Sequence, residues 1–290
     1  MNYPITPPPR LVMCAATWSM IAYPSRQREW SLTRKLTEIA TAGFDGVCAF
    51  ITPEIKTAAD RLGLVLMSSF DTQGVTAALP RLRQQRDLGV KFINLQLLNH
   101  DTPPSQAARA AVPLLRAARK LGLSVHIETH RDTATETPEK FTEIARLYQK
   151  ATGELLPVTW DHSHFAVSKH LMPAAFSARL LAWPQLIQHS QMFHLRPFNG
   201  QHCQVPVTDG RGAATPEFQD YLTFAEDLFA CWLAGPRPGH ELWVCPELGM
   251  SHGYHLSTHP HPWTDAIYAR RALVTAWEKA LLQSSSLPKN

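Results

Sequence analysis

Residues 123–128 read LSVHIE, a run of strand length in which polar and apolar side chains alternate. Seven other runs of similar length occur, and a segment with helical periodicity follows each of the eight. The seven are LVMCAA from Leu11, FDGVCAF from Phe44, LVLMSSF from Leu64, FINLQLL from Phe92, PVTWDH from Pro157, QMFHLR from Gln191 and ELWVCPE from Glu241. Eight successive β-α units are what a closed barrel requires. The sequence therefore predicts an α/β protein with one (β/α)8 TIM barrel.

The predicted helix boundaries agree with this alternation. The tripeptide Thr-Pro-Glu occurs at 52–54, 137–139 and 215–217. Each copy offers a hydroxyl that can cap a helix, a proline suited to the first turn and an early carboxylate. Four glycines shortly precede predicted strands, where a left-handed residue can end a helix. They are Gly43, Gly63, Gly89 and Gly122.

Composition and charge restrict the class of protein. The 290 residues are 44% hydrophobic, enough for one full core, and we expect a single domain over 1–290 with flexible tails at 1–10 and 284–290. No apolar run of about 18 residues and no signal-peptide pattern occurs. The net charge of +4 is too small for a nucleic-acid-binding face. Five widely spaced cysteines favour reduced thiols. We expect a cytoplasmic protein without nucleic-acid or membrane partners, and a homo-oligomer is left open.

Strand parity predicts which side chains enter the barrel, because successive residues of a strand face opposite ways. In the fifth to eighth predicted strands, the inward parity ends on residues of metal-ligand type: Glu128, Asp161, His194 and Glu247. One such residue alone is more often a surface or loop-capping group. Three carboxylates that converge inside a barrel, however, repel one another unless a cation lies between them. The set predicts one divalent metal ion, with Mn²⁺ favoured and Mg²⁺, Co²⁺ or Zn²⁺ compatible.

These residues give the chain a resemblance to the xylose isomerase-like TIM-barrel superfamily of sugar phosphate isomerases and epimerases, especially its tagatose and psicose 3-epimerase branch. In that family Glu-x-His ends the fifth strand, Asp-x-x-His the sixth, His the seventh and Glu the eighth. The matching residues here are Glu128 with His130, Asp161 with His164, His194, and Glu247. One departure follows the seventh strand, where His-x-x-Asp is common in the family and this chain has Pro197 in place of the aspartate.

The resemblance implies a metal-dependent sugar isomerase or epimerase that transfers a proton next to a carbonyl through an enediolate. Glu128 and Glu247 would be both ligands and the acid/base pair. His164 and Arg196 are suited to bind substrate oxygens, although a structural salt bridge is an equal interpretation of Arg196. The other substrate-binding candidates are His130, His100 and Trp18. Core packing is nevertheless the favoured interpretation of Trp18 and His100, as it is of Phe70 and, most strongly, of Trp160.

Other functions stay open at this point. A dehydratase of the inosose dehydratase type would use the same metal and enediolate to expel a β-hydroxyl. Endonuclease IV shares the barrel and several ligands but needs histidines on early strands, and the second and third strands here end as CAFITPE and SSFDTQ. A non-catalytic metal-holding protein would keep the fold without the activity. His252, His255, His259 and His261 are irregularly spaced, which favours a solvated loop over a second metal site.

Overall fold

The structure is a computed structural model, and it describes residues 8–235, 241–250, 253–254 and 262–286. Eight parallel strands form a closed barrel in the order β1 to β8, which confirms the predicted fold class. The strands are β1 (Arg10–Ala16), β2 (Gly46–Ala49), β3 (Val65–Thr72), β4 (Phe92–Leu97), β5 (Ser124–Glu128), β6 (Val158–Trp160), β7 (Met192–His194) and β8 (Glu241–Cys245). Each overlaps one of the runs expected from the sequence.

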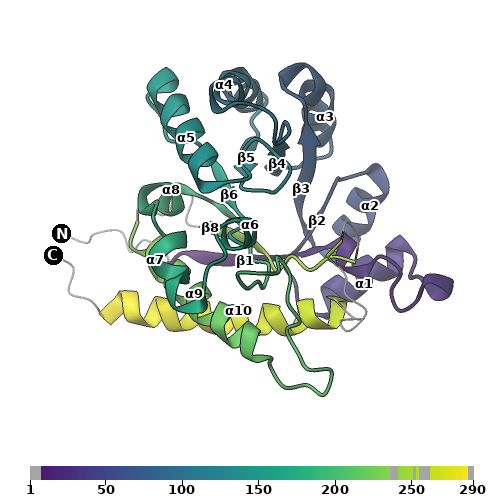
Figure 1. Ribbon diagram of the computed structural model, residues 1–290. Coiled ribbons are helices and arrows are strands. Elements are labelled where there is room, and N and C mark those ends of the chain that lie inside the picture. Colours follow the sequence, from purple (N-terminus) through teal and green to yellow (C-terminus); the bar gives the residue numbers. More distant parts are fainter. Residues whose placement is uncertain (1–7, 236–240, 251–252, 255–261, 287–290) are drawn as a thin grey trace, which may run out of the picture.

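Helices surround the barrel, as Figure 1 shows. They are α1 (Leu32–Thr41), α2 (Pro53–Leu62), α3 (Val75–Asp87), α4 (Pro104–Lys120), α5 (Pro138–Thr152), α6 (Ser163–Ser168), α7 (Phe176–Leu180), α8 (Pro184–His189), α9 (Pro216–Leu233) and α10 (Pro262–Ser286), with 3-10 helices η1 (Thr17–Met20), η2 (Arg26–Arg28) and η3 (Pro173–Ala175). The connection from β6 to β7 is thus divided among short helices. The long α10, yellow in Figure 1, packs along α9. None of the described helices combines the length and apolar composition that a membrane crossing requires.

The three expected caps are present. The hydroxyl groups of Thr52, Thr137 and Thr215 accept hydrogen bonds from main-chain N–H groups three residues on, at 3.3, 3.3 and 3.2 Å. These caps satisfy N–H groups that the first turn of a helix leaves without an intrahelical partner. The four predicted glycines all have positive φ, between 68° and 79°. Local signals therefore set the ends of the helices that carry the chain back from the carboxyl ends of the strands.

Two buried layers confirm the predicted strand parity. The barrel interior holds inward residues such as Cys14, Met67 and Phe92. The layer between strands and helices holds the outward residues, among them Val125 and Trp160, so Trp160 is a core residue as predicted. The polar residues of the alternate parity consequently point to the barrel axis.

The chain ends and the cysteines can also be compared with the predictions made from the sequence. Within the expected tail segments, Arg10 belongs to β1 and 284–286 belong to α10. All five cysteines are free. Three of them are buried on barrel strands, whereas Cys203 and Cys231 are half-buried.

Candidate metal centre and active site

Three of the four predicted ligands meet at the carboxyl ends of β5, β7 and β8. Nδ1 of His194 lies 2.7 Å from Oε1 of Glu128 and 2.9 Å from Oε2 of Glu247. One ligand atom from each residue lies within 4.8 Å of the other two, and all three residues are buried. Oε2 of Glu247 makes no well-oriented hydrogen bond to any described residue, which leaves its lone pairs available. Two carboxylate oxygens and one imidazole nitrogen at this spacing fit a divalent cation.

Asp161, the fourth predicted ligand, lies beside this cluster and contacts other groups. Its Oδ2 atom is 3.3 Å from Nε2 of His164 and 3.3 Å from Nε of Arg196. Its Oδ1 atom accepts a hydrogen bond of 2.9 Å from the main-chain N–H of Ser163. Nη2 of Arg196 in turn lies 2.7 Å from Oε1 of Glu247. The salt bridge considered for Arg196 is therefore present, and one guanidinium links Asp161 to the cluster.

Two amides that the sequence analysis missed hold Glu128 in place. Nδ2 of Asn94 and Nε2 of Gln96 donate hydrogen bonds of 2.7 and 2.9 Å to its Oε2 atom. Both amides project inward from β4, where alternate positions of FINLQLL are polar, and that alternation was the available signal. Such partners orient a ligating carboxylate and favour its charged form. Glu128 can therefore present Oε1 to the cluster.

The cluster is strongly coupled electrostatically. Burial by itself raises the pKa of Glu128, but the charge and the hydrogen bond of His194, together with the charge of His130, outweigh burial and lower that pKa to about 2. The pKa of Glu247 is also lowered, because Arg196 and His194 outweigh the effect of burial. Burial by itself lowers the pKa of His194, yet the two glutamates raise it well above the usual range. The two carboxylates thus share the positive charge of His194. A divalent cation could supply that positive charge instead.

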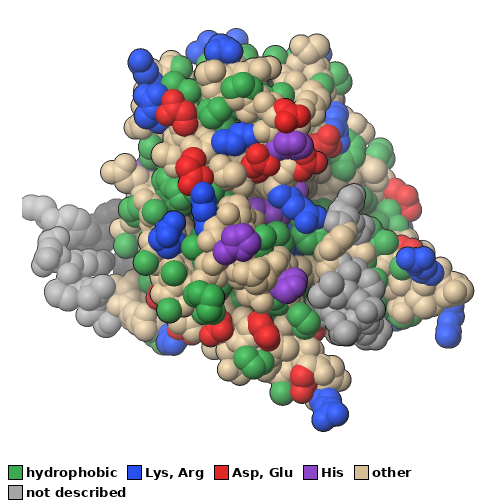
Figure 2. All heavy atoms as spheres, in the orientation of Figure 1, with side chains coloured by type: hydrophobic (Ala, Val, Ile, Leu, Met, Phe, Trp, Pro, Cys, Tyr) green, Lys and Arg blue, Asp and Glu red, His purple; other side chains and the backbone are tan. Residues whose placement is uncertain are grey.

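A cavity of about 840 Å³ opens over the cluster, and its size suits a small-molecule substrate. Three predicted substrate-binding residues, Trp18, His130 and Arg196, line it. Glu247 also lines it, whereas Glu128 is fully buried and is absent from the lining. The two glutamates therefore differ in access to a bound molecule. Figure 2 shows charged and histidine side chains gathered in the middle of the face that α6 occupies in Figure 1.

Comparison with known proteins agrees with this architecture. No protein-family model and no curated protein matches the sequence. Among solved structures, an L-ribulose 3-epimerase superposes with a TM-score of 0.61 at 12% identity, over 96% of this chain and 99% of the epimerase. A xylose isomerase-like TIM barrel/4-hydroxyphenylpyruvate dioxygenase fusion protein gives 0.60 at 18% identity over 97% of this chain, which spans 46% of the fusion protein. The chain has the xylose isomerase-like TIM-barrel fold. A probable 3-DHS dehydratase from Bacillus anthracis shares it, with a TM-score of 0.56 at 11% identity over 90% and 99% of the two chains.

Two of the predicted substrate-binding residues lie off the cavity of this xylose isomerase-like barrel. The His164 side chain is fully buried, with Nδ1 3.5 Å from Sγ of Cys203 and its ring 4.3 Å from the His130 ring. Burial by itself lowers the pKa of His164, but the charge and the hydrogen bond of Asp161, together with Cys203, outweigh burial and raise that pKa to about 9. His100 is on the rim, 52% exposed and 2.5 Å from Oδ1 of Asp132. The four histidines considered for a second metal lie outside the described residues.

Gln204 joins the two long loops that follow β7 and β8. It comes from the first loop, is buried, and accepts a hydrogen bond of 2.7 Å from the N–H of Gly249 in the second. Its Nε2 atom donates to the carbonyls of Gly249 and Tyr254 at 3.1 and 3.3 Å. Nη1 of Arg196 also contacts Gln204, at 3.4 Å. Gln204 therefore links the two loops at this wall of the cavity.

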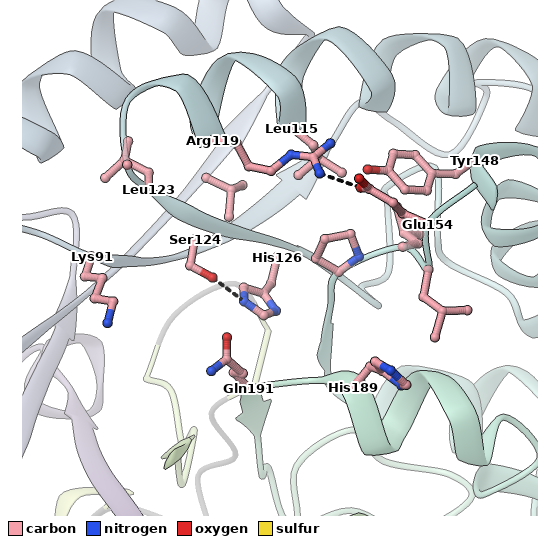
Figure 3. A pocket seen from close by; sticks show the side chains of 15 residues that line it. Lys91, Leu115, Arg119, Leu123, Ser124, His126, Tyr148, Glu154, His189 and Gln191 are labelled. Atoms are coloured by element: carbon pink, nitrogen blue, oxygen red, sulfur yellow. Dashed lines mark hydrogen bonds and ion pairs between the residues drawn. The ribbon is translucent and has the colours of Figure 1, made fainter. Parts of the chain in front are cut away.

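A second cavity, of about 690 Å³, opens at the amino-terminal end of the barrel (Figure 3). Oγ of Ser124 lies 2.9 Å from Nε2 of His126, whose Nδ1 is 3.3 Å from the carbonyl oxygen of Val158. An ion pair between Arg119 and Glu154 lies on its wall. None of the predicted metal ligands lines this cavity. Since function concentrates at the carboxyl ends of barrel strands, the first cavity is the candidate active site.

Proposed function

We propose that this protein is a divalent-metal-dependent isomerase or epimerase that transfers a proton at the carbon next to the carbonyl of a sugar or polyol-derived substrate. The observation that carries the proposal is the convergence of Glu128, His194 and Glu247 beneath the large cavity at the barrel mouth. Asp161 is proposed as the fourth ligand, because it follows β6 on the inward parity and one guanidinium, that of Arg196, contacts both it and Glu247. Mn²⁺ is the favoured metal for this mostly oxygen set.

The side chains around the cavity have separate roles in this scheme. Glu247 lines the cavity and is placed to exchange a proton with the substrate. Glu128, which contacts the same Nδ1 atom of His194 as Glu247 does, is the second proton-transfer group. His130 and Trp18 position substrate hydroxyls or the carbon chain from the cavity wall. When bound, the cation would supply the positive charge that lowers the cost of forming an enediolate.

A dehydratase is the second candidate, and the structural similarity to a probable 3-DHS dehydratase favours it. Both reactions begin with removal of a proton next to a carbonyl. They differ in the fate of the hydroxyl on the β-carbon, which stays in an isomerisation and leaves as water in a dehydration. The mass of the product therefore distinguishes the two.

The experiment incubates metal-loaded protein with a panel of ketoses and keto-polyols in D₂O and follows the products by mass spectrometry and NMR. We expect a product that keeps all its oxygen atoms and carries solvent deuterium at the carbon next to the carbonyl. A product lighter by one water would select the dehydratase. Absence of both turnover and deuterium exchange across the panel would contradict an enzymatic role of this kind.

A further inference from the structure

Gly249 lines the active-site cavity from the loop after β8, close to Glu247. A glycine is usually required where the backbone has a positive φ, or where a neighbouring atom leaves no room for a Cβ atom. Every other glycine that the structure describes meets one of these conditions. Most of them have a positive φ, and a Cβ at Gly46, Gly200 or Gly235 would lie 2.6, 2.0 or 2.2 Å from another residue.

Gly249 meets neither condition. Its φ lies outside the left-handed range, and a Cβ at this position would make ordinary van der Waals contacts. The packing and the backbone of the chain would therefore accept an alanine here. Glycine also occurs where a ligand approaches the backbone closely, and that reason is the one left for a glycine in the wall of this cavity.

A gap lies where the side chain of Gly249 would begin. Apart from the adjoining main chain, the atoms nearest to an idealised Cβ are Cδ1 of Trp18 at 3.6 Å, Cδ2 of Tyr254 at 3.7 Å and Cβ of Tyr254 at 4.0 Å. Both side chains line the cavity, as Gly249 does, so the gap opens into it. Carbon atoms attract each other best at about 3.5–4.0 Å. The gap therefore has room for about one carbon atom in contact with two aromatic rings.

One wall of the gap is fixed by a hydrogen bond between distant segments. Trp18 belongs to η1, which directly follows β1. The hydroxyl of the next residue, Ser19, donates a hydrogen bond to the carbonyl of Leu248, and both of these residues are buried. Leu248 immediately precedes Gly249. This bond therefore holds the Trp18 segment against the backbone of the glycine.

The other wall is fixed by Gln204 and Arg196. The Gln204 amide bonds to the N–H and the carbonyl of Gly249 and to the carbonyl of Tyr254, as described above. Cζ of Arg196 lies 4.0 Å from the centre of the Tyr254 ring, which fixes the orientation of this ring. The gap is thus preorganised, so a ligand that enters it does not have to order its walls.

The chemistry of the walls indicates what the gap can hold. Both main-chain groups of Gly249 are engaged by Gln204, and ring carbons of Trp18 and Tyr254 face the gap. The indole N–H of Trp18 is bonded to Cδ1, so it also borders the gap and can donate to an oxygen. A carboxylate or a phosphate group has more heavy atoms than the gap can take. A single carbon with its hydrogens and one hydroxyl matches it.

We propose that Gly249 determines the substrate specificity of the site, and that the gap beside it takes one hydroxyl-bearing carbon of the sugar chain. The rings of Trp18 and Tyr254 contact this carbon. The inference rests on the proposed function, since it describes how the same site holds its substrate. A Cβ at position 249 would occupy the place of the substrate carbon. Gly249→Ala should consequently keep the fold and exclude the substrate.

The test measures the affinity of Mg²⁺-loaded protein for D-fructose, D-psicose and D-tagatose by saturation-transfer difference NMR. For the ketose that binds the unmodified protein most tightly, we expect Gly249→Ala to weaken binding at least about tenfold, the lower end of what one methylene group is worth in a close-fitting pocket. The melting temperature of this variant should be unchanged or higher. Alanine in place of a glycine with a compatible backbone reduces the entropy of the unfolded chain.

Gly63→Ala is the matched control with the opposite pattern. Gly63 ends α2 with a φ of 68°, has no atom within 4 Å of its Cβ position and does not line the cavity. This variant should melt at a lower temperature, because alanine is strained at a positive φ, and should bind ketoses normally.

Three results would overturn the inference. They are equal ketose affinity in Gly249→Ala and the unmodified protein, a melting temperature that falls in Gly249→Ala as it does in Gly63→Ala, and absence of ketose binding to the unmodified protein. Turnover and deuterium exchange test the proposed function separately. Ketose binding without either of them would contradict only that function.

Discussion

Oδ2 of Asp161 lies 3.3 Å from Nε of Arg196, and both side chains are fully buried. Such a pair is costly to break, because removal of one partner leaves the other charge buried without a counter-ion, at about 3–5 kcal/mol. Arg196 also pairs with Glu247, so it connects the proposed fourth ligand to the cluster of three. Variants of Asp161 and Arg196 should therefore use replacements of similar size and shape.

We expect about one divalent metal ion per chain, measured by elemental analysis. His194→Ala should lower metal affinity more than about 100-fold, because it deletes a proposed direct contact and outer partners alone account for about 10–100-fold. Asp161→Asn should also lower metal affinity, because it removes the negative charge of a proposed ligand. His189→Ala, at the end of α8, is the control and should bind metal normally. Unchanged affinity in both ligand variants would place the metal elsewhere.

Gln96→Leu should weaken metal binding by about 10–100-fold, since it removes a hydrogen bond that orients Glu128. Gln85→Leu is the matched control, because this buried amide bonds instead to the main chain of Ile51. It should lower the free energy of unfolding by about 1–3 kcal/mol and leave metal affinity unchanged. Metal titrations and denaturant unfolding measure the two effects, and equal metal affinity in Gln96→Leu would refute the role of this amide.

Glu128→Gln and Glu247→Gln should each abolish turnover, because each removes one proton-transfer group while an amide oxygen can still contact a metal. Glu247 reaches the cavity directly, so we expect Glu128→Gln to retain exchange of substrate hydrogen with D₂O. NMR of recovered substrate measures that exchange. Full activity in either variant, or turnover without solvent deuterium, would exclude the two-glutamate scheme.

The protein should not cleave DNA at abasic sites. An endonuclease IV-type reaction needs further imidazole ligands from the early strands, and in the part of the chain that the structure describes one metal-type cluster occurs, Glu128 with His194 and Glu247. Gel analysis of an abasic duplex with added Zn²⁺ checks this. Robust zinc-dependent incision would reverse the choice between isomerase and nuclease.

The fold was predictable because its signals are local. Threonine caps such as Thr137 act within three residues, and strand parity follows from the alternation inside each run. The same parity also predicted that the side chains of Glu128, His194 and Glu247 converge. Local pattern was therefore sufficient for the barrel and for most of the proposed ligand set.

The rest of the site depends on contacts between distant segments. Asn94 is a neutral amide, and its role follows from the β4–β5 pairing that sets it beside the strand of Glu128. His164 contacts Cys203, which comes from a loop 39 residues further along the chain. Arg131 and Tyr254 meet only because loops from two strands fold over one cavity. Composition and periodicity carry no information about such pairings.

The contacts of Gln204 have a consequence for how new specificities could arise in this barrel. The loop after β7 and the loop after β8 share one buried amide, so they form one structural unit. A loop graft from a related barrel would have to transplant both segments together, because a mismatched pair would lose three hydrogen bonds to the Gly249 and Tyr254 main chain. Evolution of this wall should accordingly proceed by paired changes in the two loops.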